Sequence, residues 1–274
     1  MGGWFGADDA VCDNGVPATD SRGSSKIILA NRNTSFLVRK NFTDDNPEPV
    51  DVHIACNGGF ISQEEFSITD PATGGTFPFV RFIVYGMEDV GVNCDIWEDP
   101  VPFGYKQSYE AKAGTGAEHT DFGSTLEGCY YEGVKGGDYE CIVTNTLQPA
   151  SVTVNKEWFG DALDNRMPLV ADVRWSCFNV GEDSSGTPQT RRGRYTFEGA
   201  TDSFDITGLY PSYLNNSYCT VTEVDVASSV ESDASDCDKV EVPLGAGSTP
   251  SCTIYNTVFF EGIPTLSQYG MALM

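Results

Sequence analysis

The sequence has few basic residues, and this shortage limits what the protein can bind. Among its 274 residues, 16 are Lys or Arg and 40 are Asp or Glu, so the formal net charge is -24. We find no basic patch able to neutralise phosphates, and we therefore expect binding to neither nucleic acid nor anionic lipid. The excess of carboxylates is typical of a solvated, self-repelling surface.

The motifs of common metal and catalytic sites are also missing. The cysteines form no C-x-x-C pair, and His53 and His119 are far apart in the sequence, so we expect no zinc or other metal site. There is no EF-hand-type calcium loop, although clustered carboxylates leave calcium binding open as an alternative. Neither a Gly-x-Ser-x-Gly elbow nor a phosphate-binding glycine loop occurs. We therefore expect no enzyme and no cofactor, the alternative being a hydrolase built on scattered acidic residues.

Cysteine, by contrast, is abundant, with nine residues in the chain. Spaced widely in sequence rich in strand-forming residues, these cysteines indicate disulfides and an oxidising, extracellular compartment. The chain shows neither a signal peptide nor an apolar segment long enough to span a membrane. For a secreted protein, this combination suggests a fragment of a longer surface protein.

One pattern of strands occurs twice. Each copy opens with an alternating strand that has a Lys near its end, Ser35–Phe42 in the first copy and Ser151–Trp158 in the second. After an acidic turn that contains Pro, each copy continues with a strand that ends in Cys, Val50–Cys56 and Val170–Cys177. The chain therefore contains two copies of one unit.

The match continues towards the end of each copy. The strand Asn93–Glu98 corresponds to Tyr218–Glu223, and in both strands a Glu follows the second Cys of the copy by four residues. The last strand, Glu140–Thr146, corresponds to Ser251–Thr257, and in both an Asn follows the fourth Cys by four residues. Four Cys, one Lys, one Glu and one Asn thus recur in the same order.

These copies predict the fold and its divisions. Short strands separated by Gly-rich turns, without an apolar helical stripe, predict an all-β fold of tandem Ig-like or prealbumin-like antiparallel β-sandwiches stapled by disulfides. Cys12 precedes Asn31 by the same number of residues that separates Cys237 from Asn256, which suggests the end of a preceding repeat. The predicted parts are 1–34 as that remnant, 35–148 and 149–260 as the two sandwiches, and 261–274 as a C-terminal segment.

Several of these strands also resemble a known family. The lysine strands, the turn Phe204–Tyr210, the strand Tyr218–Glu223 and the closing strand Thr253–Thr257 resemble the prealbumin-like B-type repeats of bacterial collagen adhesins and pilins. The second copy matches more closely, because the first has Val84–Met87 in place of the Gly-Leu-Tyr turn. The resemblance implies a structural or adhesive stalk on a bacterial surface, with neighbouring or self-assembling repeats as partners and no catalysis on external substrates.

A second resemblance lies in the C-terminal segment. Residues 262–274 resemble the start of the IPTL-type sorting signal of Gram-negative surface proteins, with the motif formed by Ile263, Pro264, Thr265 and Leu266. In that signal an apolar spanning helix and a basic tail follow the motif. The resemblance implies a Gram-negative cell surface and a membrane contact only through an anchor that this sequence does not include.

The cysteines of each copy allow three pairings. We favour pairs of neighbours in the sequence, with a first-to-fourth pairing as the alternative, and Cys12 is left without a partner in this chain. The later pair of each copy closes a short loop, which contributes about 3 kcal/mol by the chain-entropy model. The favoured pairs are Cys56–Cys94, Cys129–Cys141, Cys177–Cys219 and Cys237–Cys252.

The recurring Lys, Glu and Asn acquire a role through the family resemblance. In the adhesin family, a core Lys condenses with an Asn of the last strand, and a neighbouring acid promotes the reaction. A buried Lys tends towards the neutral, nucleophilic amine, and a buried Glu tends towards the protonated form that can shuttle protons. The alternative is that these are surface or edge residues kept from a common fold. By position, the two sets are Lys40, Glu98 and Asn145, and Lys156, Glu223 and Asn256.

A rival function is an extracellular ligand-binding module for a matrix glycan or calcium. Aromatic residues expected in loops of the first copy could stack on sugars, although core packing explains such residues more often. An exposed aromatic platform favours the binding module, whereas buried aromatics favour the stalk. The residues considered are Trp97, Phe103, Tyr130 and Tyr131.

Overall fold

Strands dominate the protein. The computed structural model describes residues 18–19, 25–26, 33–44, 46–69, 78–86, 91–114, 121–160, 169–245 and 249–259. Within these ranges the only helical element is the 3-10 turn η1, Ser235–Cys237, and no helix there has the length and apolar composition to cross a membrane. The predicted all-β fold with disulfides is confirmed. Cys12 and the motif Ile263, Pro264, Thr265 and Leu266 lie outside the described residues.

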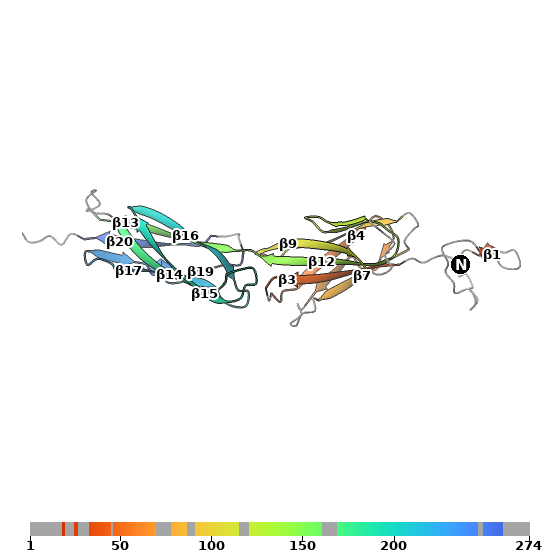
Figure 1. Cartoon of the computed structure of the whole chain (residues 1–274), viewed down its shortest axis with the longest axis horizontal. Helices are drawn as coiled ribbons and strands as arrows, with labels where there is room; N and C mark the ends of the chain where they lie inside the picture. The colour runs from red at the N-terminus through yellow and green to blue at the C-terminus, as the bar shows by residue number, and fades with distance from the viewer. Residues whose placement is uncertain are drawn as a thin grey trace, which may run out of the picture. The chain divides into compact units, whose positions relative to one another are not determined.

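Contacts divide the chain into two compact units (Figure 1). The first unit comprises Met1–Asn41, Pro47–Val101 and Gln107–Asn145. The second comprises Phe42–Asn46, Pro102–Lys106 and Thr146–Met274. Ahead of the first sandwich, β1 (Ala18–Thr19) and β2 (Ser25–Lys26) form a short antiparallel pair.

The first unit contains two five-stranded sheets, with strand orders β10-β11-β8-β4-β6 and β5-β7-β3-β12-β9. Ring contacts join the sheets face to face, since the Phe36 and Tyr131 centroids are 5.1 Å apart and those of Phe66 and Phe82 are 5.0 Å apart. The strands are β3 (Thr34–Phe42), β4 (Val50–Cys56), β5 (Phe60–Ile61), β6 (Glu65–Ile68), β7 (Phe79–Tyr85), β8 (Val92–Glu98), β9 (Tyr105–Ala113), β10 (Asp121–Ser124), β11 (Cys129–Val134) and β12 (Gly137–Leu147).

The second unit is a continuous path of strands, β18-β20-β13-β16-β14-β17-β19, with β15 paired to β14. Strands β14 and β16 meet at two residue pairs only, so the path folds there into two layers around one core. Strand β20 runs parallel to β13, the first strand of the unit. The strands are β13 (Ala150–Phe159), β14 (Val170–Gly181), β15 (Gln189–Glu198), β16 (Thr201–Pro211), β17 (Tyr218–Val224), β18 (Val230–Asp233), β19 (Val240–Glu241) and β20 (Ser251–Val258).

The two-residue period of the strands explains where the two recurring lysines, Lys40 and Lys156, lie. Along β3 and β13, every second side chain is buried. Lys40 has the parity of Phe36 and Val38, and Lys156 has the parity of Val152 and Val154. Because the apolar residues fix which face of the strand is inward, each lysine is directed into the core.

Four disulfides staple the sandwiches. Each unit has one bond between adjacent strands of a sheet, joining β4 to β8 in the first and β14 to β17 in the second. A further bond joins β11 to β12 across the two sheets of the first unit, and another joins η1 to β20 in the second. The bonded pairs are Cys56–Cys94, Cys129–Cys141, Cys177–Cys219 and Cys237–Cys252.

One expectation from composition is wrong, because the chain does contain a basic cluster. Arg174 of β14 lies opposite Arg194 of β15, and Arg192 lies opposite the neighbouring Ser176. All three arginines are exposed. Overall composition could not reveal this cluster, although Arg192 and Arg194 belong to the short basic run at 191–194. The register of the hairpin adds Arg174 to them.

Candidate functional site

The first cluster joins three elements of the first unit inside its core. Lys40 comes from β3, Asn145 from β12, the neighbour of β3 in the sheet, and Glu98 from the end of β8 in the opposite sheet. Their exposed fractions are 1% for Lys40, 0% for Asn145 and 3% for Glu98. The acid thus reaches across the sandwich to the strand pair that contains the amine and the amide.

Glu98 contacts both partners with different oxygens. Lys40 Nζ donates to Glu98 Oε2 at 2.8 Å, and Asn145 Nδ2 donates to Glu98 Oε1 at 2.8 Å. The other amide atom, Asn145 Oδ1, is buried without a hydrogen-bond partner among the described residues. The amine and the amide are therefore gathered on one carboxyl group, and the amide carbonyl has no donor to stabilise its present state.

Burial changes the acidity of the amine. Removal from water lowers the pKa of Lys40 to about 8, and the charge of Glu98 opposes this shift without cancelling it. A lysine exposed to water is almost wholly charged at neutral pH. Lys40 is therefore much closer to the neutral amine, the form that acts as a nucleophile.

The second cluster has the same composition in the second unit. Lys156 comes from β13, Glu223 from β17 and Asn256 from β20. Asn256 Nδ2 donates to Glu223 Oε1 at 2.7 Å, whereas Lys156 Nζ lies 3.4 Å from Glu223 Oε2. Asn256 Oδ1, like its counterpart in the first unit, is buried without a hydrogen-bond partner among the described residues. Both predicted sets are thus brought together.

The surroundings of Lys156 differ in detail from those of Lys40. Lys156 Nζ also approaches Ile254 O at 3.4 Å and lies 4.8 Å from the centroid of the Trp158 ring. The Ser232 hydroxyl donates to Glu223 Oε2 at 2.6 Å and so shares the oxygen that faces Lys156. Burial lowers the pKa of Lys156 as well, with Glu223 opposing the shift.

These contacts provide the groups for one reaction. A neutral Lys amine is a nucleophile, the Asn side-chain carbonyl is an acyl donor, and a carboxyl group between them can accept and return protons. In both clusters the Lys and Asn lie on the first and last long strands of their unit. Sequence spacing identified all six residues, whereas Ser232 has no spacing signal and emerges only from the pairing of β18 with β20.

The aromatic residues considered for glycan stacking do not form one platform. Tyr131 is fully buried and packs in the core, so its assignment to a binding surface is wrong. Phe103 is 67% exposed, and Tyr130 is half-buried. Within the described ranges, no group of three or more His, Cys, Asp or Glu side chains could hold a metal ion.

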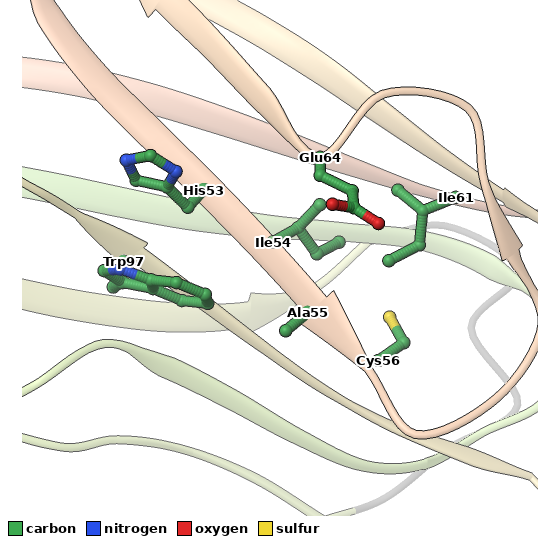
Figure 2. A pocket seen from close by; sticks show the side chains of 7 residues that line it. All are labelled: His53, Ile54, Ala55, Cys56, Ile61, Glu64 and Trp97. Carbon is green, nitrogen blue, oxygen red and sulfur yellow. The ribbon is translucent and has the colours of Figure 1, made fainter.

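Trp97 forms a stacked pair with His53 on the surface, which no sequence motif indicates. Figure 2 shows it beside His53, and the two rings are stacked with centroids 5.5 Å apart and an interplanar angle of 19°. His53 Nε2 lies 3.0 Å from Asp99 O, which fixes the imidazole against β8. These two residues occupy opposing positions on β4 and β8, facing outward from the first unit.

No protein-family model matches the chain, and no curated protein is similar to it in sequence. Solved structures give weak matches. The Bacillus anthracis TIE protein is 12% identical over 83% of this chain and 34% of its own, with a TM-score of 0.39. A single B repeat of the collagen-binding surface protein of Staphylococcus aureus is 16% identical, with 83% and 100% covered and a TM-score of 0.28.

The major pilin of Streptococcus pyogenes is 12% identical over 84% of this chain and 99% of its own, with a TM-score of 0.32. At these scores the matches say nothing of the activity, ligands or partners of this chain. The Gram-negative expectation depends on residues 262–274, which lie outside the described residues.

Proposed function

We propose that the chain is a structural or adhesive stalk segment of a secreted bacterial surface protein, in which each sandwich closes itself with a Lys–Asn isopeptide bond. One observation supports this most directly: each unit holds a buried amine and a buried amide on the same carboxyl group. The protein does no chemistry on external substrates in this proposal. Its own side chains are the reactants.

The reaction balances without any added reagent. In the first unit, neutral Lys40 Nζ attacks Asn145 Cγ and forms a tetrahedral intermediate. Glu98, hydrogen-bonded to both partners and in its protonated form when the amine is neutral, delivers its proton to the leaving amide nitrogen and takes one back from the attacking nitrogen. The C–N bond of the side-chain amide breaks, ammonia departs, and a secondary amide joins the two residues. The same steps apply to the cluster of the second unit.

The location of the bonds gives them a mechanical purpose. Each would link the first long strand of a sandwich to the last, β3 to β12 and β13 to β20. A pulling force that enters at one strand would then leave through the other without extending the chain between them. The disulfides lie within these same units and stabilise the enclosed strands. Together the crosslinks suit a rod that holds other domains away from a cell.

The proposal keeps the wider context inferred from the sequence. Residues 35–148 and 149–260 would be two members of a longer array, with neighbouring repeats or a matrix component as partners. Residues 1–34 would end a preceding repeat, and 261–274 would begin the sorting signal.

Peptide mapping tests the chemistry at the level of residues. After reduction, alkylation and digestion, the proposal expects two branched peptides, one joining Lys40 to Asn145 and one joining Lys156 to Asn256. The matched controls are Glu98→Gln and Glu223→Gln, each of which should abolish only the branched peptide of its own unit. Recovery of all four residues in linear, unmodified peptides from the unaltered protein would contradict the proposal.

A further inference from the structure

The outer sheet faces of the two units can be compared residue by residue. The bonds Cys56–Cys94 and Cys177–Cys219 occupy the same cross-strand position in β4–β8 and β14–β17. Counting back three residues from the first Cys gives His53 in one unit and Arg174 in the other. Their opposing residues on the neighbouring strand are Trp97 and Thr222. The two faces are thus equivalent in position but differ in chemistry.

The face of the second unit is basic. Arg174 and Arg194 lie directly opposite each other, and Arg192 is two residues along the same exposed face of β15. None of the three forms an ion pair with a carboxylate of the described residues, and the nearby Asp172 accepts a hydrogen bond from Thr196 at 2.5 Å. Like charges opposite each other destabilise a sheet. We call Arg174, Arg192 and Arg194 the arginine face.

The face of the first unit is acidic and contains a hollow. The position opposite His53 is taken by Glu65, where the second unit has Arg194 opposite Arg174. Beside Trp97 lies a cavity of about 680 Å³. Its lining includes no Lys, Arg or His. The residues of this acidic hollow that matter here are Ala55, Asp95, Trp97, Asp99, Gln107 and Glu127.

A further feature makes the acidic hollow suited to a cation. Partial burial raises the pKa of Asp95, and the charge of Glu127 raises it further, because the two carboxylates repel each other. A cation placed between them would relieve that repulsion. Ala55, which lies near Trp97 in Figure 2, contributes only a methyl group to the lining of the acidic hollow.

We propose that the arginine face of one copy of this protein docks on the acidic hollow of a second copy. A guanidinium group suits the hollow, because it pairs in a fork with carboxylates, donates to amide oxygens and stacks on indole rings. The occupant is a second copy because the chain itself presents three unpaired arginines on the equivalent face, in a protein where acids outnumber bases by 40 to 16.

Such a contact would be heterologous, since each copy would use a different face. Heterologous contacts that do not close into a ring propagate, so copies would associate into chains or bundles. This association does not depend on the isopeptide bonds. It adds to the proposed stalk a means of lateral or end-to-end assembly.

Charge reversal on each face tests the proposal. Association is measured by sedimentation velocity over a concentration series at physiological ionic strength. The Debye length is then about 8 Å, so the net negative charge acts only between groups in close contact. The unaltered protein should self-associate. Arg192→Glu with Arg194→Glu should weaken the association about tenfold or more, and Asp95→Lys with Glu127→Lys should do the same. Mixing these two variants should restore association, because each then offers the face that the other lacks.

A matched control separates the faces from general charge effects. Lys106→Glu with Lys112→Glu makes the same change of charge as the double arginine variant, but on β9 and outside both faces, and should leave association unchanged. Disulfide mapping of every variant confirms that its fold is retained. A monomeric unaltered protein at all concentrations overturns the proposal, as does failure of the mixed variants to associate. Binding of a sulfated glycan by the arginine face, without self-association, also overturns it.

Discussion

The two units contain the same Lys, Glu and Asn, but the first holds its amine closer to the acid. The Lys–Glu distance is 2.8 Å for Lys40 and 3.4 Å for Lys156. Both acid side chains are buried, with exposed fractions of 0% for Glu98 and 5% for Glu223, but Glu223 also accepts the Ser232 hydroxyl. The sequence match to the adhesin repeats is closer in the second unit, yet the contacts are closer in the first. The identity of the three residues therefore places them together in both units. The contacts around them, such as that of Ser232 with Glu223, set the Lys–Glu distance and so the expected rate of bond formation.

The largest expected difference comes from removing each crosslink in turn. Lys40 and Asn145 are 105 residues apart (145 minus 40), and Lys156 and Asn256 are 100 apart (256 minus 156). By the chain-entropy model, a crosslink that closes a loop of about 100 residues contributes about 4.7 kcal/mol. We expect Glu98→Gln and Glu223→Gln to lower the free energy of unfolding of their own units by about this much under reducing conditions.

Denaturant unfolding of the reduced protein, followed by a probe in each unit, measures this effect. Trp97 reports on the first unit and Trp175 on the second, so each variant should shift one transition and spare the other. A variant that loses its crosslink but keeps its unfolding midpoint would show that the bond adds nothing to stability.

The disulfides that close short loops should have smaller and nearly equal effects in the two units. Cys129–Cys141 closes a separation of 12 residues and Cys237–Cys252 one of 15. Loops of this size contribute about 3 kcal/mol each. Replacing both cysteines of a pair by Ala should therefore cost a similar amount in either unit, as measured by urea unfolding under oxidising conditions. A cost confined to one unit would mean that strain or packing, rather than loop closure, determines the contribution.

The pH dependence of bond formation distinguishes the roles of amine and acid. The reactive state, with a neutral Lys40 and a protonated Glu98, has the same number of protons as the ion pair. Its population is therefore independent of pH until the pair loses a proton, which occurs near the Lys40 pKa of about 8. We expect the rate in the first unit to be level below this pH and to fall above it.

The rate can be measured by purifying the chain in denaturant and refolding it at a series of pH values. The loss of ammonia is then followed over time by mass spectrometry. A rate that instead rises towards pH 8 and then levels off would show that the reactive state has one proton fewer, with a neutral Lys40 and an ionised Glu98. That result would contradict the protonated form assigned to Glu98 and leave the nucleophilic role of Lys40.

The smallest expected effect is the loss of the Ser232 hydroxyl. Because Ser232 donates to the oxygen of Glu223 that faces Lys156, Ser232→Ala should free that oxygen for the amine. A single hydrogen bond is worth about 1 kcal/mol, so the second unit should form its bond up to about fivefold faster. The same refolding assay measures this rate, with the unaltered first unit of the same molecule as an internal reference. A slower second unit would show that Ser232 orients the acid rather than competing for it.

The sequence predicted the location of the candidate site because its residues lie on regular strands. Alternation alone directs Lys40 and Lys156 inward, and the fixed spacing from the cysteines places the Glu and Asn at the matching depth. What it could not predict depends on long-range register. Ser232 reaches Glu223 through the pairing of β18 with β20, and Arg174 meets Arg194 through a hairpin with an irregularity after Phe178. Tyr131 was misjudged because it was expected in a loop, whereas it lies in β11 and faces the core.

Intact mass of the fully reduced and unfolded protein tests the central claim most directly. The account predicts a mass lower than that of the sequence by two molecules of ammonia, one for each unit. Lys40→Arg and Lys156→Arg should each restore one of them, and the double variant should have its full calculated mass. An unaltered protein with the full mass of its sequence would contradict the account, and the two clusters would then be buried ion pairs without the chemistry.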